Sequence, residues 1–276
     1  MTVPDLEAGE VTVTQRLLGT ARARADHPAL VCGSADQACS YGDLAVTVQA
    51  AAAGLAGRGL QPGDVVGIYL PDAACYAIAT YAVRAAGGVP SPVGSALSVP
   101  DIACQLADCG ARMLLTGPAL AAAAQAAADR SWVRQVISFG EAAGASRFDK
   151  LLGIGVLAPV EAKPHDLALL PYARRPDGML APVPVTQQEL AGQLSKLAAK
   201  TRMGGRDVIL AAPPAGDGRA YTALLDHALI SGATIVAVRT SEICAAASRY
   251  HATIAIVPSG AGIGAGDHLR VLAVAS

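Results

Sequence analysis

Short, uninterrupted apolar strands that alternate with helices are the feature that most limits what this sequence can fold into. The apolar run Val65–Leu70 stops at Pro71. A helix is then predicted over Ala73–Ala86, and the next strand begins at Val89 after two glycines. A strand that is apolar on both faces must be covered on both faces, as in parallel sheets flanked by helices. We therefore predict an α/β fold with mainly parallel sheets.

The same alternation continues along the whole chain, whose 276 residues are enough for a large core. Hydrophobic residues make up 53% of the sequence and charged residues 16%, so much of the chain has to be buried. We predict two stacked αβ subdomains, residues 1–165 and residues 166–276, that form one compact unit.

The charge and the apolar patterning exclude several classes of partner. The formal net charge is −1, so the sequence lacks the basic character of a protein that binds nucleic acid or an anionic membrane. No apolar stretch is long enough to span a bilayer, and the alanine-rich run 119–128 is too short. The first ten residues lack the basic start and apolar stretch of a secretory signal. The sequence predicts a cytoplasmic protein.

The cysteines and histidines give no indication of a metal or redox centre. None of the six cysteines forms a Cys-x-x-Cys pair, and the five histidines do not cluster around them. Buried thiols that act as small apolar residues are the expected interpretation.

Several turn motifs occur in the order and spacing of one enzyme family. They are Ser40–Leu44, the turn Gly59–Val66 with its Pro62-Gly63-Asp64 core, Leu70–Asp72, Leu106–Arg112 and Ser231–Thr234. Together they resemble the adenylate-forming (AMP-binding) superfamily, which includes acyl-CoA synthetases, aryl-CoA ligases and luciferases. The resemblance implies the fold of the N-terminal domain of an acyl-CoA ligase. Retained turns indicate a shared scaffold and not a shared activity.

The segment Asp166–Thr186 resembles the ATP-binding signature of this family, but most of the residues that work in that signature are replaced. The positions that match are Asp166, Ala168, Tyr172, Gly178, Val183 and Thr186. Where the family has a run of Ser, Thr and Gly, this chain has Ala173, Arg174, Arg175, Pro176 and Asp177. The family's Pro-Lys-Gly becomes Leu180, Ala181 and Pro182.

These replacements remove what a phosphate-binding loop needs. Glycines let backbone N–H groups converge on phosphate oxygens, hydroxyls add donors, and a lysine adds a mobile charge. Pro176 donates no N–H, and Asp177 would repel a phosphate. Any surviving nucleotide contact would come from the degenerate loop positions Tyr172, Arg174, Arg175, Gly178 and Thr186.

Two other segments depart from the family pattern. Pro214 falls on the proline of the family's Pro-x-Phe-His segment, but Gly216 replaces the phenylalanine and Asp217 the histidine near the acyl pocket. The sequence ends at Ser276, before the adenine-binding turn, the ribose-binding aspartate and the lid with its catalytic lysine that the resemblance implies. We therefore expect a truncated N-terminal core without the C-terminal lid domain.

Two further patterns suggest chemistry at first sight. Gly260–Ala265 formally fits a dinucleotide fingerprint, but no helix and no acidic residue at the required distance can follow it. Asp226 and His227 suggest an acid–base pair, but neighbours on one helix point in different directions. We predict no catalytic residue at either place.

The sequence predicts an acyl-CoA ligase-like protein that cannot adenylate on its own and acts as an interaction, assembly or regulatory pseudoenzyme. We expect a dimer or a complex with another protein through exposed apolar surface. No cofactor is expected, with ATP, AMP and CoA bound only if the family activity survives. Two alternatives stay open: part of an ATP-dependent fatty-acid or aryl-acid–CoA ligase completed by another chain, or a protein that binds acyl or aryl acids without converting them.

Overall fold

The computed structural model describes residues 11–32, 37–153, 155, 157, 160–213, 218–261 and 269–274. Its helices in these ranges are α1 (Val13–Ala23), α2 (Tyr41–Gly57), α3 (Ala73–Ala85), α4 (Val99–Asp108), α5 (Ala121–Ala128), α6 (Gln187–Lys200), α7 (Gly218–Ile230) and α8 (Ile243–Arg249). Short 3-10 turns cover Pro118–Leu120, Phe148–Leu151 and Thr240–Glu242.

The strands of the described residues form two large sheets and two small ones. They are β1 (Pro28–Cys32), β2 (Gln37–Ser40), β3 (Val65–Tyr69), β4 (Val89–Pro92), β5 (Met113–Thr116), β6 (Gln135–Ser138), β7 (Ser146–Arg147), β8 (Leu167–Leu169), β9 (Tyr172–Arg174), β10 (Leu180–Pro182), β11 (Val185–Thr186), β12 (Val208–Ala211), β13 (Thr234–Ala237), β14 (Ile254–Pro258) and β15 (Arg270–Val274).

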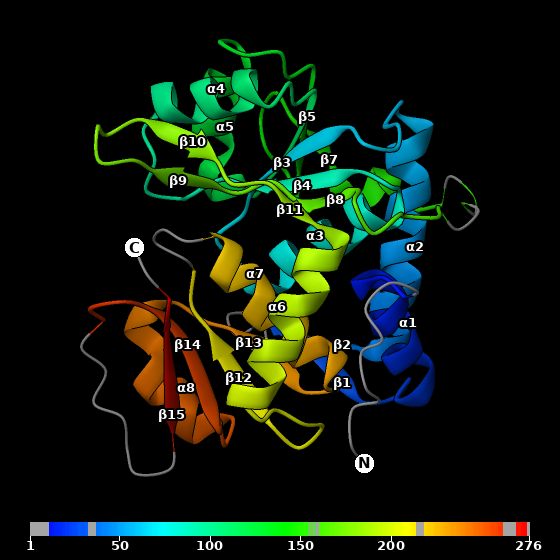
Figure 1. Ribbon diagram of the computed structural model, residues 1–276, viewed down its shortest axis with the longest axis vertical. Coiled ribbons are helices and arrows are strands. Elements are labelled where there is room, and N and C mark those ends of the chain that lie inside the picture. The colour runs from blue at the N-terminus through cyan, green and yellow to red at the C-terminus, as the bar shows by residue number, and fades with distance from the viewer. Residues whose placement is uncertain are drawn as a thin grey trace.

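The two large sheets lie one above the other in Figure 1. The upper sheet has the order β4-β3-β5-β6-β7, and all its neighbouring strands are parallel. The lower sheet has the order β15-β14-β12-β13-β1-β2, and only β2 runs antiparallel to its neighbour. The predicted α/β fold with mainly parallel sheets is confirmed.

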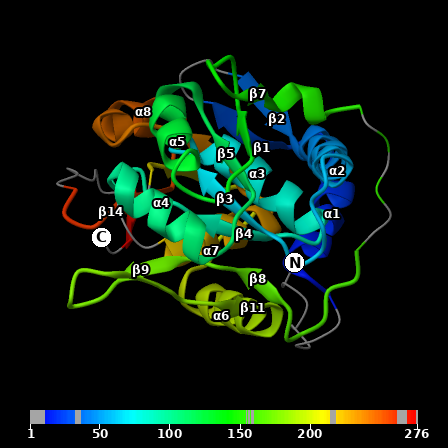
Figure 2. The ribbon, with the colours of Figure 1, turned by 90° about the horizontal axis from the view of Figure 1, so that it is seen from above.

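A helical layer between the sheets carries most of the core. The largest apolar cluster joins the inner faces of both sheets, with Ile68 from the upper sheet and Ile235 from the lower one. Helix α3 contacts β3 and β4 on one side and β13 on the other, and α7 contacts β13 beside it. Smaller clusters under α4 and α5, and under α8, cover the outer faces of the two sheets. Figure 2 shows these layers from above.

Capping side chains mark the first turns of α2 and α3, at the positions that the sequence motifs predict. The Ser40 hydroxyl accepts a hydrogen bond from the backbone N–H of Asp43, and the Asp43 carboxylate accepts one from the Ser40 N–H. This reciprocal capping satisfies two donors that the first turn of α2 would otherwise leave unpaired. Asp72 caps α3 in a simpler way, by accepting a hydrogen bond from the N–H of Cys75.

Sheet membership does not follow the predicted subdomain boundary between residues 165 and 166. Strands β1 and β2 come from the start of the chain but belong to the lower sheet, where β1 pairs with β13. The Tyr41 hydroxyl strengthens this connection, because it donates to the backbone oxygens of Leu229 and Ala233 at 2.9 and 2.8 Å. The division into residues 1–165 and 166–276 stays a prediction.

Within the described ranges, no helix is both long and apolar enough to cross a lipid bilayer. The longest, α2, has 17 residues. The alanine-rich run that the sequence places outside a membrane becomes α5, whose Ala124 and Ala127 are buried against the outer face of the upper sheet.

Candidate functional site

The segment that aligns with an ATP-binding loop folds into an antiparallel hairpin of β9 and β10. Ala173 lies opposite Ala181, and Tyr172 lies opposite Pro182. The hairpin projects beside α4 at the upper left of Figure 1. Its turn runs from Arg175 to Met179. Gly178 in this turn has a positive φ of 83°, which glycine adopts readily.

Hydrogen bonds within the turn use most of its backbone donors. The N–H of Arg175 donates to the Met179 oxygen at 2.8 Å, and the N–H of Gly178 donates to the Arg175 oxygen at 2.9 Å. The N–H of Met179 donates to a carboxylate oxygen of Asp177 at 3.0 Å. Pro176 has no N–H. The turn therefore closes on itself and does not present a concave set of free amides.

Both arginines of the hairpin are paired with carboxylates of the same chain. Nη2 of Arg174 lies 3.2 Å from Oδ2 of Asp101 on α4, and Nη1 of Arg174 donates to the backbone oxygen of Gly178 at 2.5 Å. Nη2 of Arg175 lies 3.0 Å from Oδ2 of Asp177. A hydrogen bond from Ser98, followed by that from Arg174, lowers the pKa of the Asp101 carboxyl.

Tyr172 and Thr186 have structural partners as well. The Tyr172 hydroxyl donates to Asp108 of α4 at 2.5 Å, and burial together with this carboxylate raises the pKa of Tyr172. Thr186 caps α6: its hydroxyl accepts from the N–H of Glu189 at 3.2 Å, and the Glu189 carboxylate accepts from its N–H at 2.9 Å. The five predicted loop positions are thus held by contacts inside the chain.

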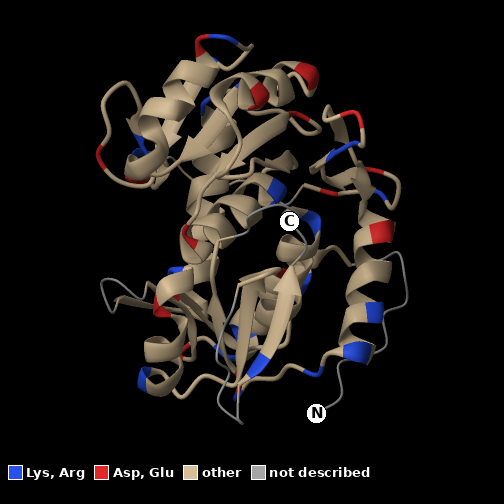
Figure 3. Cartoon of the chain, turned by 90° about the vertical axis from the view of Figure 1, so that its left-hand side faces the viewer, with Lys and Arg blue, Asp and Glu red and all other residues tan. Residues whose placement is uncertain are grey.

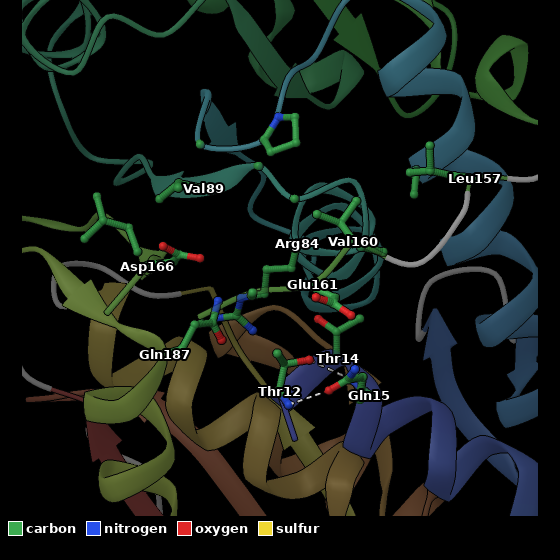
Figure 4. Close-up of a pocket in the computed structure, with 18 of the residues that line it drawn as sticks. Thr12, Thr14, Gln15, Arg84, Val89, Leu157, Val160, Glu161, Asp166 and Gln187 are labelled. Atoms are coloured by element: carbon green, nitrogen blue, oxygen red, sulfur yellow. Dashed lines mark hydrogen bonds between the residues drawn. The ribbon is translucent and has the colours of Figure 1, made fainter. Parts of the chain in front are cut away.

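A cavity of about 360 Å³ lies elsewhere, beside the C-terminal end of α3. Its described walls come from α1, α2, the end of α3, residue 157, residues 160–162 and 166–167, and the first residue of α6. The turns at Gly63 and Gly87 place it at the amino ends of β3 and β4. Figure 4 shows the side chains of Arg84, Glu161, Asp166 and Gln187 around this space.

Arg84 is the buried charged residue of this cavity. Its Nη1 donates to both carboxylate oxygens of Asp226 on α7 at 3.0 Å, and its Nε donates to the Ala168 oxygen at 3.1 Å. The two side chains are 3% and 2% exposed. Nη2 is also buried, and it has no hydrogen-bond partner among the described residues.

Comparison with known families decides the ancestry of the chain. The AMP-binding enzyme family matches residues 18–261, which is most of the sequence. The chain belongs to the AMP-binding enzyme family.

Individual relatives agree with this assignment. The chain is 26% identical over 250 residues to 4-coumarate–CoA ligase 5 of Oryza sativa subsp. japonica, covering 85% of this chain and 45% of the relative. It superposes on a long-chain-fatty-acid–CoA ligase of Archaeoglobus fulgidus with a TM-score of 0.82 at 19% identity, covering 95% of this chain and 54% of that one. It also matches the N-terminal domain of FACL13 from Mycobacterium tuberculosis, with a TM-score of 0.78 at 18% identity over 91% of this chain and 64% of that one.

The match therefore lies in the N-terminal domain of the acyl-CoA ligases, as the turn motifs predict. The chain spans about half the length of 4-coumarate–CoA ligase 5 and of the Archaeoglobus enzyme. At 18–19% identity, the structural likeness establishes the fold alone.

Membership in the AMP-binding family makes a nucleotide triphosphate the group to test against the hairpin. The fit is poor. The turn amides of Arg175, Gly178 and Met179 are already bonded, and both guanidinium groups already have anionic partners. Ala181 supplies no charge where the family has lysine. The hairpin lacks the converging free donors that hold phosphate oxygens.

The other residues that the sequence singled out behave as structural groups where they are described. Asp226 is buried in its ion pair with Arg84, while His227 directs Nε2 at the Thr201 oxygen, 2.7 Å away. Burial lowers the pKa of His227. Pro214, Gly216 and Asp217 lie outside the described residues, as do the last four positions of Gly260–Ala265.

The arrangement of possible metal ligands and of charged residues can be followed in the described part of the chain. Across the described ranges, no group of three or more His, Cys, Asp or Glu side chains is arranged to hold a metal ion. None of the six cysteines is in a disulfide; four are half-buried and Cys104 and Cys244 are exposed, so the expectation that they are buried is wrong. Basic and acidic residues are interspersed over the face shown in Figure 3.

Sequence reasoning missed Arg84 and the cavity. The available signal was one arginine at the end of the apolar helix α3 and one aspartate inside the apolar helix α7. An isolated charge on an apolar helix needs a partner, and each of these two residues is the partner of the other.

Proposed function

We propose that this chain acts in the cytoplasm as a non-adenylating member of the AMP-binding family, with an interaction, assembly or regulatory role. The observation that carries the proposal is that the donors of the β9–β10 hairpin are paired within the chain. The amides of Arg175, Gly178 and Met179 donate within the turn, and Arg174 and Arg175 are bound to carboxylates. A phosphate would have to break these contacts before it could be bound.

Strand β15 is the surface that best suits a protein partner. It is one of the two edge strands of the six-stranded sheet among the described strands, with β2 at the other edge, and Arg270, Val271 and Ala273 are exposed along it. An edge strand presents unpaired backbone groups on which another chain can add a strand. We propose that a second copy of this chain, or another protein, docks here.

The absence of adenylation is tested by ATP–pyrophosphate exchange with fatty and aryl acids, including long-chain fatty acids and 4-coumarate. The proposal predicts no exchange above the protein-free background. It also predicts no rise in melting temperature with ATP-Mg or AMP, because a ligand stabilises the folded state only as far as it binds that state. Exchange with any acid by the chain alone would refute the proposal.

The assembly role is tested by light scattering coupled to size-exclusion chromatography. We expect an assembly larger than a monomer, and we expect Val271→Lys to weaken it by placing a charge on the edge strand. Val46→Lys is the matched control, because Val46 is also exposed but lies on α2. A strictly monomeric chain at high concentration with no co-purifying partner would contradict this part of the proposal.

A second candidate function is one part of an acid–CoA ligase that another chain completes. What supports it is the extent of the match, which spans 45% of 4-coumarate–CoA ligase 5 and 54% of the Archaeoglobus enzyme. It requires a partner that supplies the remaining motifs and a substitute for the phosphate loop. Pyrophosphate exchange that appears only when the partner is added would favour this candidate over the first.

A third candidate function is the binding of acyl or aryl acids without their conversion. The observation behind it is the cavity of about 360 Å³ beside α3, which is large enough for a small molecule. Calorimetry with free acids tests it directly. Saturable binding of an acid without pyrophosphate exchange would favour this candidate.

A further inference from the structure

A second, smaller cavity of about 180 Å³ lies at the amino ends of β3, β5 and β6. These three parallel strands are neighbours in the five-stranded sheet, so the loops that lead into them meet at one edge. The cavity is lined by the turn after α2, the turn after α4 and the first residue of each strand. It shares no lining residue with the cavity beside α3 or with the hairpin.

Three of the residues that line this cavity are arginines. Arg112 and Arg134 directly precede β5 and β6, and the N–H of Arg134 donates to the backbone oxygen of Arg112 at 2.8 Å. Their side chains therefore start from neighbouring strands, which lie about 4.8 Å apart. Arg58 ends α2 at the same place, where Nε2 of Gln135 donates to its backbone oxygen at 3.1 Å. Like charges gathered in this way repel each other unless an anion lies between them.

The three guanidinium groups are available to a ligand. Within the described ranges, none of them has a carboxylate at ion-pairing distance or a hydrogen-bond partner. Exposed arginines elsewhere, such as Arg174 and Arg239, do have a carboxylate partner. Arg112 and Arg134 are exposed and Arg58 is half-buried, so a ligand reaches their donors from solvent. A guanidinium is a planar fork of donors that matches the oxygens of a phosphate.

Negative groups offset only part of this positive charge. Asp64 is the carboxylate of the lining, and its Oδ2 already accepts a hydrogen bond from the N–H of Gln61 at 2.9 Å. Helices α2 and α4 also end beside the cavity, at Arg58 and just before Gly110, and each carboxyl end carries roughly half a negative charge. Against three arginines, about one positive charge remains. The cavity therefore favours an anion.

The size of the cavity restricts the anion to a small one. Its volume is below the roughly 300–1,000 Å³ of pockets that enclose a drug-sized ligand. Gly59 and Gly110 have open space where a Cβ would stand, so no side chain at these two turns narrows the cavity. We propose that the cavity binds a free tetrahedral oxyanion, inorganic phosphate, through the guanidinium groups of Arg58, Arg112 and Arg134. It has no room for a nucleoside, so the site is separate from the proposed function and from nucleotide binding.

A titration with inorganic phosphate at constant ionic strength tests the site, followed by calorimetry and through the backbone amide resonances of Gly59 and Gly110. We expect saturable shifts of both resonances with one dissociation constant in the millimolar range or below. Sodium chloride at the same ionic strength should not produce them. No saturable shift, or equal shifts with chloride, would overturn the site. AMP that binds there as tightly as phosphate would overturn the assignment to the free ion.

Substitutions of exposed or half-buried side chains locate the binding and leave the core untouched. Arg112→Gln and Arg134→Gln should each weaken phosphate binding about tenfold, because each removes a charge-assisted hydrogen bond. Arg130→Gln is the matched control, since this exposed arginine lies outside the lining. Asp64→Asn keeps an oxygen that can accept from Gln61 but removes the opposing charge, so it should tighten binding about twofold.

Two results from the variants would overturn the site. One is an Arg130→Gln variant that loses as much affinity as Arg134→Gln, which would indicate attraction by the general surface charge. The other is an Asp64→Asn variant that binds phosphate no more tightly than the unmodified chain. The proposed function is measured by pyrophosphate exchange and at the hairpin, so its failure is distinguishable from a failure here. Circular dichroism of each variant shows whether it is folded.

Discussion

The β9–β10 hairpin and the α3–α7 interface both pair arginine with aspartate, but the hairpin pair is exposed to solvent and the interface pair is buried. The Arg174 and Asp101 side chains are 51% and 38% exposed, whereas those of Arg84 and Asp226 are 3% and 2% exposed. On the hairpin, every guanidinium group and most turn amides are occupied. At the interface, the best-buried arginine of the two regions retains a free nitrogen.

The two regions therefore differ in how many hydrogen-bond donors are left without a partner. The hairpin aligns with the family's ATP-binding signature, but its donors are paired within the chain. The cavity beside Arg84 is lined in part by the family turn motif at Pro62 and Gly63, and the buried Arg84 has a donor without a partner among the described residues. A family motif therefore shows ancestry, and the hydrogen bonds of the folded chain show which donors are still available.

The largest expected effect comes from removing one partner of the buried pair. Asp226→Ala leaves the Arg84 charge buried and unpaired, which costs about 3–5 kcal/mol of unfolding free energy. Urea unfolding measures the loss. The matched hairpin variant Asp101→Ala should leave the unfolding midpoint nearly unchanged, because solvent screens an exposed pair. Equal losses in the two variants would remove the contrast between the regions.

A hydroxyl deletion in each region sharpens the comparison at a smaller scale. The Tyr76 hydroxyl lies 2.6 Å from the Thr222 hydroxyl, which itself donates to the Gly218 oxygen at 2.6 Å. Tyr76→Phe should therefore cost about 1 kcal/mol, the net value of a buried hydrogen bond. Tyr172→Phe on the hairpin should cost less in the same urea experiment. A larger loss for Tyr172→Phe would contradict this ranking.

Restoring the family's lysine should change little. Ala181→Lys puts a positive charge at the family's position, but the amides of Arg175, Gly178 and Met179 remain bonded within the turn. We expect no thermal stabilisation by ATP-Mg beyond that of the unmodified chain. Ala181→Gln serves as the uncharged control, and clear stabilisation of the lysine variant alone would show that charge, and not free amides, was the missing element.

The smallest effect is a pH dependence of the hairpin contact. Because the folded-state pKa of Asp101 is lowered, its contribution to stability is present above the usual carboxyl range and is lost as pH falls through the lowered value. Carbon-detected NMR of the carboxyl group should show Asp101 titrating at lower pH in the unmodified chain than in Arg174→Gln. Identical titration curves would mean that Arg174 does not hold this carboxylate in solution.

The sequence predicts the layered fold well because apolar runs report burial directly. Val65–Leu70 and Ala73–Ala86 become β3 and α3 almost unchanged. The strand β2 has only four residues, two of them exposed, and no apolar run marks it. Because β2 is not predicted from the sequence, the sequence does not show how the start of the chain joins the six-stranded sheet.

The sites are harder to predict because their partners are distant in the chain. Arg84 and Asp226 are 142 positions apart, and Arg174 and Asp101 are 73 apart. Local spacing can show that Pro176 and Asp177 are unsuited to a phosphate, but it cannot show which carboxylates bind the adjacent arginines. A cavity at the amino ends of β3 and β4 is also unexpected, because ligands of parallel α/β sheets usually bind at the carboxyl ends.

The chain keeps the AMP-binding fold, and we propose that its hairpin no longer accepts a nucleotide phosphate. A titration with ATP-Mg, followed through the backbone amide resonances of Arg175, Gly178 and Met179, tests it most directly. We expect these resonances to stay in place up to millimolar nucleotide. Saturable shifts of all three with one dissociation constant would show instead that the hairpin opens and binds phosphate.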